Sequence, residues 1–136
     1  MTKDAFNALK ILVAEDEAFS QKIVVMVLNN LGAKNIALAQ NGAEALEILA
    51  TATTGQPFNL VISDIKMPVM DGFELARRIR SGIVPKYKDI PILTLTGHST
   101  EENVHKGRAH GIQGFIVKPP SADILERHMK RVLKMK

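Results

Sequence analysis

The chain contains no cysteine, and aromatic residues make up only 4% of its 136 positions. Without cysteine there is no disulfide framework, thiolate metal site or cysteine nucleophile, and this composition is compatible with the cytoplasm. The first eight residues contain no apolar segment of the kind found in signal peptides, and no apolar run is long enough to span a bilayer. We therefore expect a cytoplasmic protein that does not associate with membranes.

Hydrophobic residues account for 46% of the chain and charged residues for 24%, which is enough for a proper core and argues against disorder. A length of 136 residues is typical of one domain, and no internal repeat or linker interrupts the sequence. We predict a single domain over residues 1–136, with its core at about residues 9–135.

The net charge of +4 is unevenly distributed. Residues 1–76 hold 5 Lys and Arg against 9 Asp and Glu, a balance of −4, whereas residues 77–136 hold 13 against 5, a balance of +8. A basic half can bind nucleic acid or an acidic protein. Its basic residues are scattered, however, and only Tyr87 and Phe115 are aromatic there. Direct binding to nucleic acid is therefore not favoured.

Five short apolar runs alternate along the chain with five segments whose apolar residues recur at helical spacing. The runs predict strands at residues 9–14, 36–39, 58–64, 90–96 and 114–117, and the helices follow residues 17, 41, 71, 99 and 121. This alternation implies a parallel sheet with helices on both faces. Right-handed crossovers make it a doubly wound α/β fold.

Local signals predict where some of the helices begin and which side chains they expose. Asn41 with Glu44 and Ser99 with Glu102 each have the spacing of a capping box, and Ser121 is placed to cap the last helix. Residues 51–57 and 81–89 are predicted loops. The helix after Asp71 is predicted to show three basic side chains to solvent, those of Arg77, Arg78 and Arg80.

Four of the predicted strands end in polar residues, and these are Glu15 and Asp16, Asp64, Thr96 and Lys118. A doubly wound sheet brings the carboxyl ends of its strands together at one edge, where ligands bind. Pro68 and the pair Asp71-Gly72 force a loop after Asp64. We therefore predict one functional site that contains all of these side chains.

The charges of this cluster indicate its chemistry. Three carboxylates repel one another, by about 4 kcal/mol for each pair at ~4 Å and an effective dielectric of ~20, and Lys118 can neutralise only one of them. A site with a few oxygen ligands suits Mg²⁺. A carboxylate can also attack phosphorus to form an aspartyl phosphate. A metal, a lysine and a threonine are the groups that stabilise a transferred phosphoryl group.

Four motifs in this order resemble those of the response-regulator receiver domains of the chemotaxis-regulator type, and the resemblance covers residues 9–135. The motifs are Leu12-Val13-Ala14-Glu15-Asp16, Asp64-Ile65-Lys66-Met67-Pro68-Val69-Met70-Asp71-Gly72, Leu95-Thr96-Gly97 and Phe115-Ile116-Val117-Lys118-Pro119. The resemblance implies a flavodoxin-like sheet with strand order 2-1-3-4-5. It also implies a regulatory phosphoacceptor domain in a two-component phosphorelay, which is not an enzyme but assists its own phosphorylation and dephosphorylation.

The resemblance implies a role for each residue of the cluster. Asp64 would accept a phosphoryl group from a phosphohistidine on a sensor histidine kinase or a histidine phosphotransfer protein. Glu15, Asp16, Asp64 and the Lys66 carbonyl would bind Mg²⁺. Lys118 would pair with the phosphate, and its bond to Pro119 is expected to be cis.

The switch residues implied by the resemblance are Thr96, whose hydroxyl would close on the phosphate, and Phe115, which would turn inward on activation. Phe115 stands where many relatives have tyrosine. The positions of Lys66 and His98 flank the path of the attacking water, so substitutions there should change the rate of dephosphorylation. The signal would then reach a surface formed by the weak helix of residues 100–110, strand 114–117 and the last helix.

That surface is basic, so we expect it to select an acidic protein target or to support a phosphorylation-dependent dimer of an otherwise monomeric chain. One alternative is a receiver fragment of a larger regulator with a DNA-binding or enzymatic output, although the chain ends directly after the last predicted helix. The other is a flavodoxin-like ligand-binding protein. Glu15-Asp16-Glu17 argues against that alternative, because these carboxylates would repel a flavin phosphate.

Overall fold

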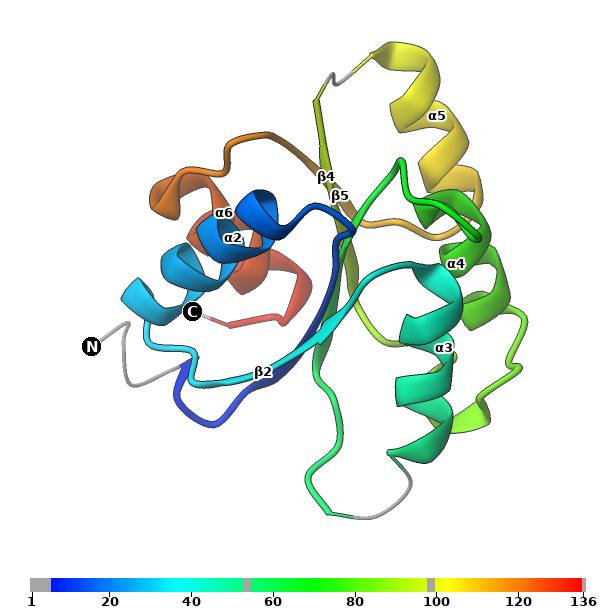
Figure 1. The fold of residues 1–136 in the computed structure, drawn as a ribbon, viewed down its shortest axis with the longest axis horizontal. Coiled ribbons are helices and arrows are strands. Elements are labelled where there is room, and N and C mark those ends of the chain that lie inside the picture. Colours follow the sequence, from blue (N-terminus) through cyan, green and yellow to red (C-terminus); the bar gives the residue numbers. More distant parts are fainter. Residues whose placement is uncertain (1–5, 53–54, 98–99, 136) are drawn as a thin grey trace.

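The computed structural model describes residues 6–52, 55–97 and 100–135. Figure 1 shows a central sheet with helices on both sides. The elements are β1 (Lys10–Ala14), α2 (Ala18–Asn30), β2 (Asn35–Ala39), α3 (Gly42–Thr51), β3 (Leu60–Asp64), α4 (Gly72–Arg80), the 3₁₀ turn η1 (Pro85–Tyr87), β4 (Ile92–Thr96), α5 (Glu101–Ala109), β5 (Gly114–Val117) and α6 (Ala122–Val132). Within these residues no helix is long and apolar enough to cross a membrane.

The five strands are all parallel and lie in the order β2-β1-β3-β4-β5. The predicted doubly wound fold and its strand order are therefore confirmed. Ala14 of β1 pairs with Ser63 of β3, and Thr96 of β4 pairs with Val117 of β5. Because of this register, the residues that follow these strands emerge at the same edge of the sheet.

Two apolar layers cover the faces of the sheet. Successive side chains of a strand point to opposite faces, so Ile11 and Val13 of β1 enter one layer and Leu12 and Ala14 the other. The first layer lies against α2 and α6, and the second lies against α3 and α4, beside which α5 is placed (Figure 1). Every residue of β3 and β4 is buried. This explains why these two strands read as continuous apolar runs in the sequence.

Side-chain caps begin the helices as the sequence predicts, with one correction. Asn41 accepts a hydrogen bond from the backbone N–H of Glu44 at 2.8 Å, and Ser121 caps α6 in the same way. Ser99 lies outside the described residues. The cap of α5 is instead Thr100, which accepts from the N–H of Asn103 at 3.1 Å. The capping prediction for this helix was therefore wrong by one residue.

The boundaries of several elements also differ from the predictions. β3 and β4 each begin two residues later than predicted, and Thr51 belongs to α3 rather than to a loop. The predicted loop of residues 81–89 contains η1, which buries Tyr87. The Tyr87 hydroxyl donates to the carbonyl of Ala52 at 3.1 Å and accepts from the N–H of Phe58 at 3.2 Å. This bridge joins segments that are distant in the sequence.

Arg80 does not face solvent as predicted. It is half-buried and donates to the carbonyls of Lys88, Ile90 and Gly111 at distances of 2.7 to 3.2 Å. Burial lowers the pKa of Arg80, which Asp89 partly offsets. The guanidinium thus ties α4 to the loop before β4 and to the turn that ends α5.

α5 has little apolar contact with the rest of the domain. Its one buried residue is Gly107, whereas α4 buries Gly72, Phe73, Leu75, Ala76 and Ile79. A fully buried side chain of leucine, isoleucine or phenylalanine contributes about 1.5–3 kcal/mol. Because α5 lacks such anchors, we still expect it to belong to the less stable part of the domain.

Candidate functional site

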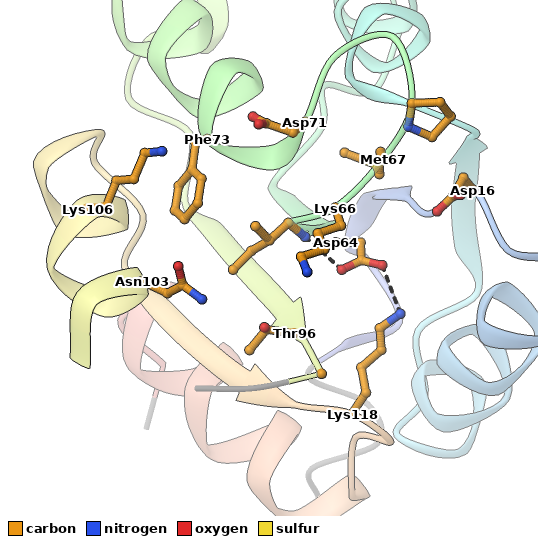
Figure 2. Close-up of a pocket in the computed structure, with 13 residues that line it drawn as sticks. Asp16, Asp64, Lys66, Met67, Asp71, Phe73, Thr96, Asn103, Lys106 and Lys118 are labelled. Atoms are coloured by element: carbon orange, nitrogen blue, oxygen red, sulfur yellow. Dashed lines mark hydrogen bonds and ion pairs between the residues drawn. The ribbon is translucent and has the colours of Figure 1, made fainter. Parts of the chain in front are cut away.

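The predicted strand-end residues meet at one edge of the sheet. Lys118, directly after β5, reaches across β4 and places its ammonium 2.7 Å from Oε1 of Glu15 and 2.8 Å from Oδ2 of Asp64. Figure 2 shows the ion pair between Lys118 and Asp64. Thr96 is the last residue of β4, which lies between β3 and β5, and it is buried. The bond between Lys118 and Pro119 is cis. The structure therefore brings together residues that are up to 103 positions apart.

Asp64 is held rigidly at the end of β3. Its Oδ1 accepts the N–H of Ile65 at 2.7 Å, while Oδ2 binds Lys118. Behind it, the N–H of Gly72 donates to the carbonyl of Ile65 at 2.8 Å. A Cβ at position 72 would collide with the carbonyl oxygen of Asp64 and would lie 3.0 Å from the Cα of Ile65. Glycine is therefore required where the loop returns under the carboxylate.

The pKa values of Glu15 and Lys118 are both raised, for different reasons. Burial raises the pKa of Glu15, although hydrogen bonds from Lys118 and the Glu17 N–H act in the opposite direction. For Lys118, burial alone would lower the pKa, but its hydrogen bonds to Asp64 and Glu15 outweigh this and raise it. The lysine is thus the fixed positive charge of the site. It neutralises only part of the negative charge around it.

Carboxylate oxygens of Glu15, Asp16 and Asp64 all lie within 4.8 Å of one another. Glu15 is buried and Asp16 is exposed, so the cluster opens to solvent on the Asp16 side. Three oxygen donors at this spacing fit a hard divalent cation such as Mg²⁺, which keeps several water ligands and needs few from the protein. Lys66 lines the same cleft (Figure 2). The residues therefore fit the metal that the sequence led us to expect.

Asp16 and Asp64 of the acidic cluster line a cleft of about 770 Å³ that extends towards α5. No sequence pattern predicted the far wall of this cleft, where the Lys106 ammonium lies 4.7 Å from the centre of the Phe73 ring. Asn103 lies one turn before Lys106 and lines the same wall (Figure 2). Their spacing of three residues places both on one face of a helix. That spacing does not reveal which face meets the cleft.

The two predicted switch residues lie on neighbouring strands. Thr96 lines the cleft, whereas Phe115 on β5 is half-buried and packs against the second apolar layer, below α5. A Cβ at Gly107 of α5 would lie 2.6 Å from Cε2 of the Phe115 ring and closer still to Cζ. The ring therefore occupies the space left by the missing side chain of Gly107. His98, for which we predicted an effect on dephosphorylation, lies outside the described residues.

Comparison with known proteins agrees with this geometry. The profile of the family described as response regulator receiver domain matches residues 11–130. This chain belongs to that family. The receiver domain is 30% identical to a chemotaxis protein CheY homolog of Campylobacter jejuni over 125 residues, which are 92% of each chain.

Solved structures extend the comparison. The chemotaxis response regulator CheY4 of Vibrio cholerae is 34% identical and has a TM-score of 0.78, with 91% of this receiver domain and 98% of that chain covered. The receiver domain of the histidine kinase CKI1 from Arabidopsis thaliana, complexed with Mg²⁺ and BeF₃⁻, has a TM-score of 0.83 at 23% identity and covers 98% and 95% of the two chains. The second likeness shows the fold alone. Both agree with the sheet and helices described above.

Proposed function

We propose that Asp64 accepts a phosphoryl group from a phosphohistidine in a Mg²⁺-dependent reaction, and that this change switches a surface formed by α5, β5 and α6. The observation that carries the proposal is the ion pair between Lys118 and Asp64, at the end of a buried strand and beside two further carboxylates. A nucleophilic carboxylate needs nearby positive charge to approach a phosphoryl dianion, and Lys118 supplies it. The domain acts as a regulator and not as an enzyme.

In the transfer step, a carboxylate oxygen of Asp64 forms a bond to phosphorus while the phosphorus–nitrogen bond of the phosphohistidine breaks. The leaving imidazole keeps the electron pair and takes a proton. Lys118 is positioned to pair with an oxygen of the phosphoryl group, and Thr96 lines the cleft from which its hydroxyl can donate to another. These two side chains replace the water that would otherwise solvate the added charge.

Glu15, Asp16 and Asp64, together with the Lys66 carbonyl, would hold Mg²⁺. When bound, the ion supplies positive charge that offsets the repulsion between the carboxylates and the phosphoryl oxygens. The Arabidopsis thaliana receiver domain of the same fold was solved with Mg²⁺ and BeF₃⁻, which supports the proposal. Membership of the family supports a histidine kinase or a histidine phosphotransfer protein as the phosphodonor.

The output surface is proposed from the contacts of α5. Phosphate on Asp64 offers Thr96 a strong acceptor, and movement of Thr96 makes room that Phe115 can fill. Because Phe115 packs against Gly107, a change in the ring shifts the balance between two packings of α5. Exposed basic residues on α5 and α6 favour an acidic protein partner, and these are His105, Lys106, Arg108, Arg127 and Arg131.

Mass spectrometry after incubation with acetyl phosphate tests the phosphoacceptor. We expect one added phosphoryl group in the presence of Mg²⁺, much less with EDTA, and none in Asp64→Asn. The matched control is Asp71→Asn, because Asp71 lines the same cleft and an asparagine there can still cap α4. A full signal in Asp64→Asn, or its loss in Asp71→Asn alone, would contradict the assignment.

Hydrogen exchange with and without beryllofluoride and Mg²⁺ tests the switch. We expect changes in protection that spread from the loop after Asp64 to α5 and β5. Changes that stay confined to that loop would show that this surface is not the output of the domain.

A further inference from the structure

Val69 combines two unfavourable properties, an exposed apolar side chain and a left-handed backbone conformation. Its side chain is 84% exposed, more than any other large hydrophobic side chain among the described residues. Its backbone also has φ of 69°, in the left-handed region. For a β-branched residue this conformation is a genuine outlier, because Cβ crowds the backbone. Glycine or asparagine would suit the position better, and a polar residue would suit its exposure.

The loop imposes this conformation. The N–H of Met70 donates to the carbonyl of Pro68 at 2.7 Å, which closes a three-residue turn around Val69. The carbonyl of Met70 in turn accepts from the N–H of Gly42 at 3.0 Å, so the loop is fixed to the start of α3. The turn therefore presents the valine side chain outward in one orientation. Strain of this kind is found where the presented group has a function.

The position of the turn indicates what that function is. Residues 65–68 and Asp71 of the same loop line the cleft that contains Asp64, whereas Val69, directly after Pro68, does not line it. Two other exposed apolar side chains lie close in the sequence to strand ends at this edge. They are Phe19, which is 69% exposed and lies just after Asp16, and Val117, which is 51% exposed and precedes Lys118. Exposed apolar side chains thus end or closely follow three of the strands whose ends carry the site, β1, β3 and β5.

We infer that Val69 is a specificity-determining contact for a protein phosphodonor, and that its side chain enters an apolar depression beside the phosphohistidine of that donor. The inference rests on the proposed function of Asp64. A small phosphodonor that enters the cleft does not meet Val69, because Val69 is not part of the cleft wall. A protein that brings a phosphohistidine to Asp64 must also cover the loop that follows Asp64. It would bury the valine side chain that the fold leaves in water.

The test compares Val69→Asn with wild type, with Val69→Ile and with Ile83→Asn. Asparagine tolerates the left-handed conformation and removes the apolar contact, whereas isoleucine keeps the apolar contact and the strain. Ile83 is 57% exposed and precedes β4, at the opposite edge of the sheet, so it controls for the loss of an exposed apolar side chain. Each variant receives phosphate from acetyl phosphate with Mg²⁺ and from a phosphorylated histidine phosphotransfer domain. That domain is chosen as the one of a purified panel that transfers fastest to wild type.

For Val69→Asn we expect a melting temperature about 2–5 °C higher, because the strain is relieved. The rate with acetyl phosphate should stay within about twofold of wild type. The kcat/KM for transfer from the protein should fall by about tenfold or more, which is what losing a fully buried valine contact implies. Val69→Ile and Ile83→Asn should transfer at rates close to wild type.

Equal transfer from the protein donor to wild type and Val69→Asn would overturn the inference, and so would an equal loss in Ile83→Asn. A lower melting temperature for Val69→Asn would contradict the strain argument. If wild type is phosphorylated by acetyl phosphate but by no protein of the panel, the inference fails while the phosphoacceptor assignment stands. If acetyl phosphate itself leaves Asp64 unmodified, the proposed function fails first.

Discussion

Gly107→Ala separates local helix propensity from tertiary packing at the proposed switch. Gly107 lies inside α5 with φ outside the left-handed region, so alanine can adopt its backbone conformation. Propensity alone predicts that this change stabilises the domain by about 1 kcal/mol. The added Cβ, however, would lie 2.6 Å from Cε2 of Phe115 and 3.3 Å from Cδ1 of Ile112. The first contact is impossible without movement of the ring.

Overpacking of this kind costs about 1–3 kcal/mol. Packing should therefore match or exceed the propensity gain, and we expect Gly107→Ala to lower the free energy of unfolding by about 0–2 kcal/mol. In a Phe115→Ala background the obstacle is gone, so the same change should raise the free energy of unfolding by about 1 kcal/mol. Urea unfolding of wild type, both single variants and the double variant measures the coupling, which should be about 1–3 kcal/mol.

The same four proteins test whether the packing of the Phe115 ring is energetically coupled to ligand binding at the phosphoryl site. If activation moves the ring away from Gly107 into the room left by Thr96, Gly107→Ala destabilises the resting packing and should strengthen the binding of beryllofluoride, by up to about tenfold for each 1.4 kcal/mol of lost packing. Phe115→Ala should abolish this effect of position 107. Stabilisation of wild type by Gly107→Ala, with no coupling to Phe115, would refute the packing argument. Unchanged beryllofluoride binding with intact coupling would refute only the link to activation.

Three further predictions concern stability. Asp16→Asn should raise the unfolding midpoint of the metal-free protein, because a carboxylate oxygen of Asp16 lies within 4.8 Å of two other carboxylates and each repulsion is worth about 1 kcal/mol at the dielectric of water. The unfolding midpoint of the variant should also depend less on Mg²⁺. A midpoint in EDTA below that of wild type would contradict this prediction. Arg80→Lys should lower the free energy of unfolding by about 1–3 kcal/mol in urea, because lysine cannot reach three carbonyls. Arg77→Lys, at an exposed ion pair, should have a much smaller effect, and equal effects would show that the buried contacts of Arg80 contribute little. Burial, and to a smaller extent two arginines of α6, lower the pKa of His128 in the folded protein below 6.5. As the pH drops from 6.5, the histidine is therefore protonated in the unfolded chain before it is protonated in the folded one, and the free energy of unfolding falls until the pH reaches the folded pKa. His128→Gln should flatten that part of the pH profile, and an unchanged slope would exclude this histidine.

The sequence by itself determined the architecture and which strand-end side chains lie together. Apolar runs such as those of β3 and β4 are buried on both faces, which only a parallel sheet covered by two layers of helices allows. Once the sheet is parallel, the residues after its strands must share one edge. Asp64 and Lys118 could therefore be assigned to one site although they are 54 positions apart. The sequence motifs and the alternation of strands and helices predict the sheet and its strand ends, because both can be recognised from residues that are close together in the chain.

Contacts between distant segments were decided only by the tertiary structure. The sequence showed Arg80 as one basic residue among three, and its half-buried place arises from carbonyls up to 31 positions away. Tyr87 likewise appeared in a loop, and its burial depends on Ala52 and Phe58. Helical spacing shows which residues share a face, but not which neighbour that face meets.

The backbone conformation of Val69 and the contact between Gly107 and Phe115 were also decided only by the tertiary structure. The left-handed backbone of Val69 results from a loop tied to α3, and a valine carries no sequence signal for such a turn. The contact between Gly107 and the Phe115 ring depends on the distance between α5 and β5, which is set by the packing of the whole layer. Sequence patterns report preferences of single residues and of near neighbours. Strain and close approach arise where tertiary packing overrides those preferences.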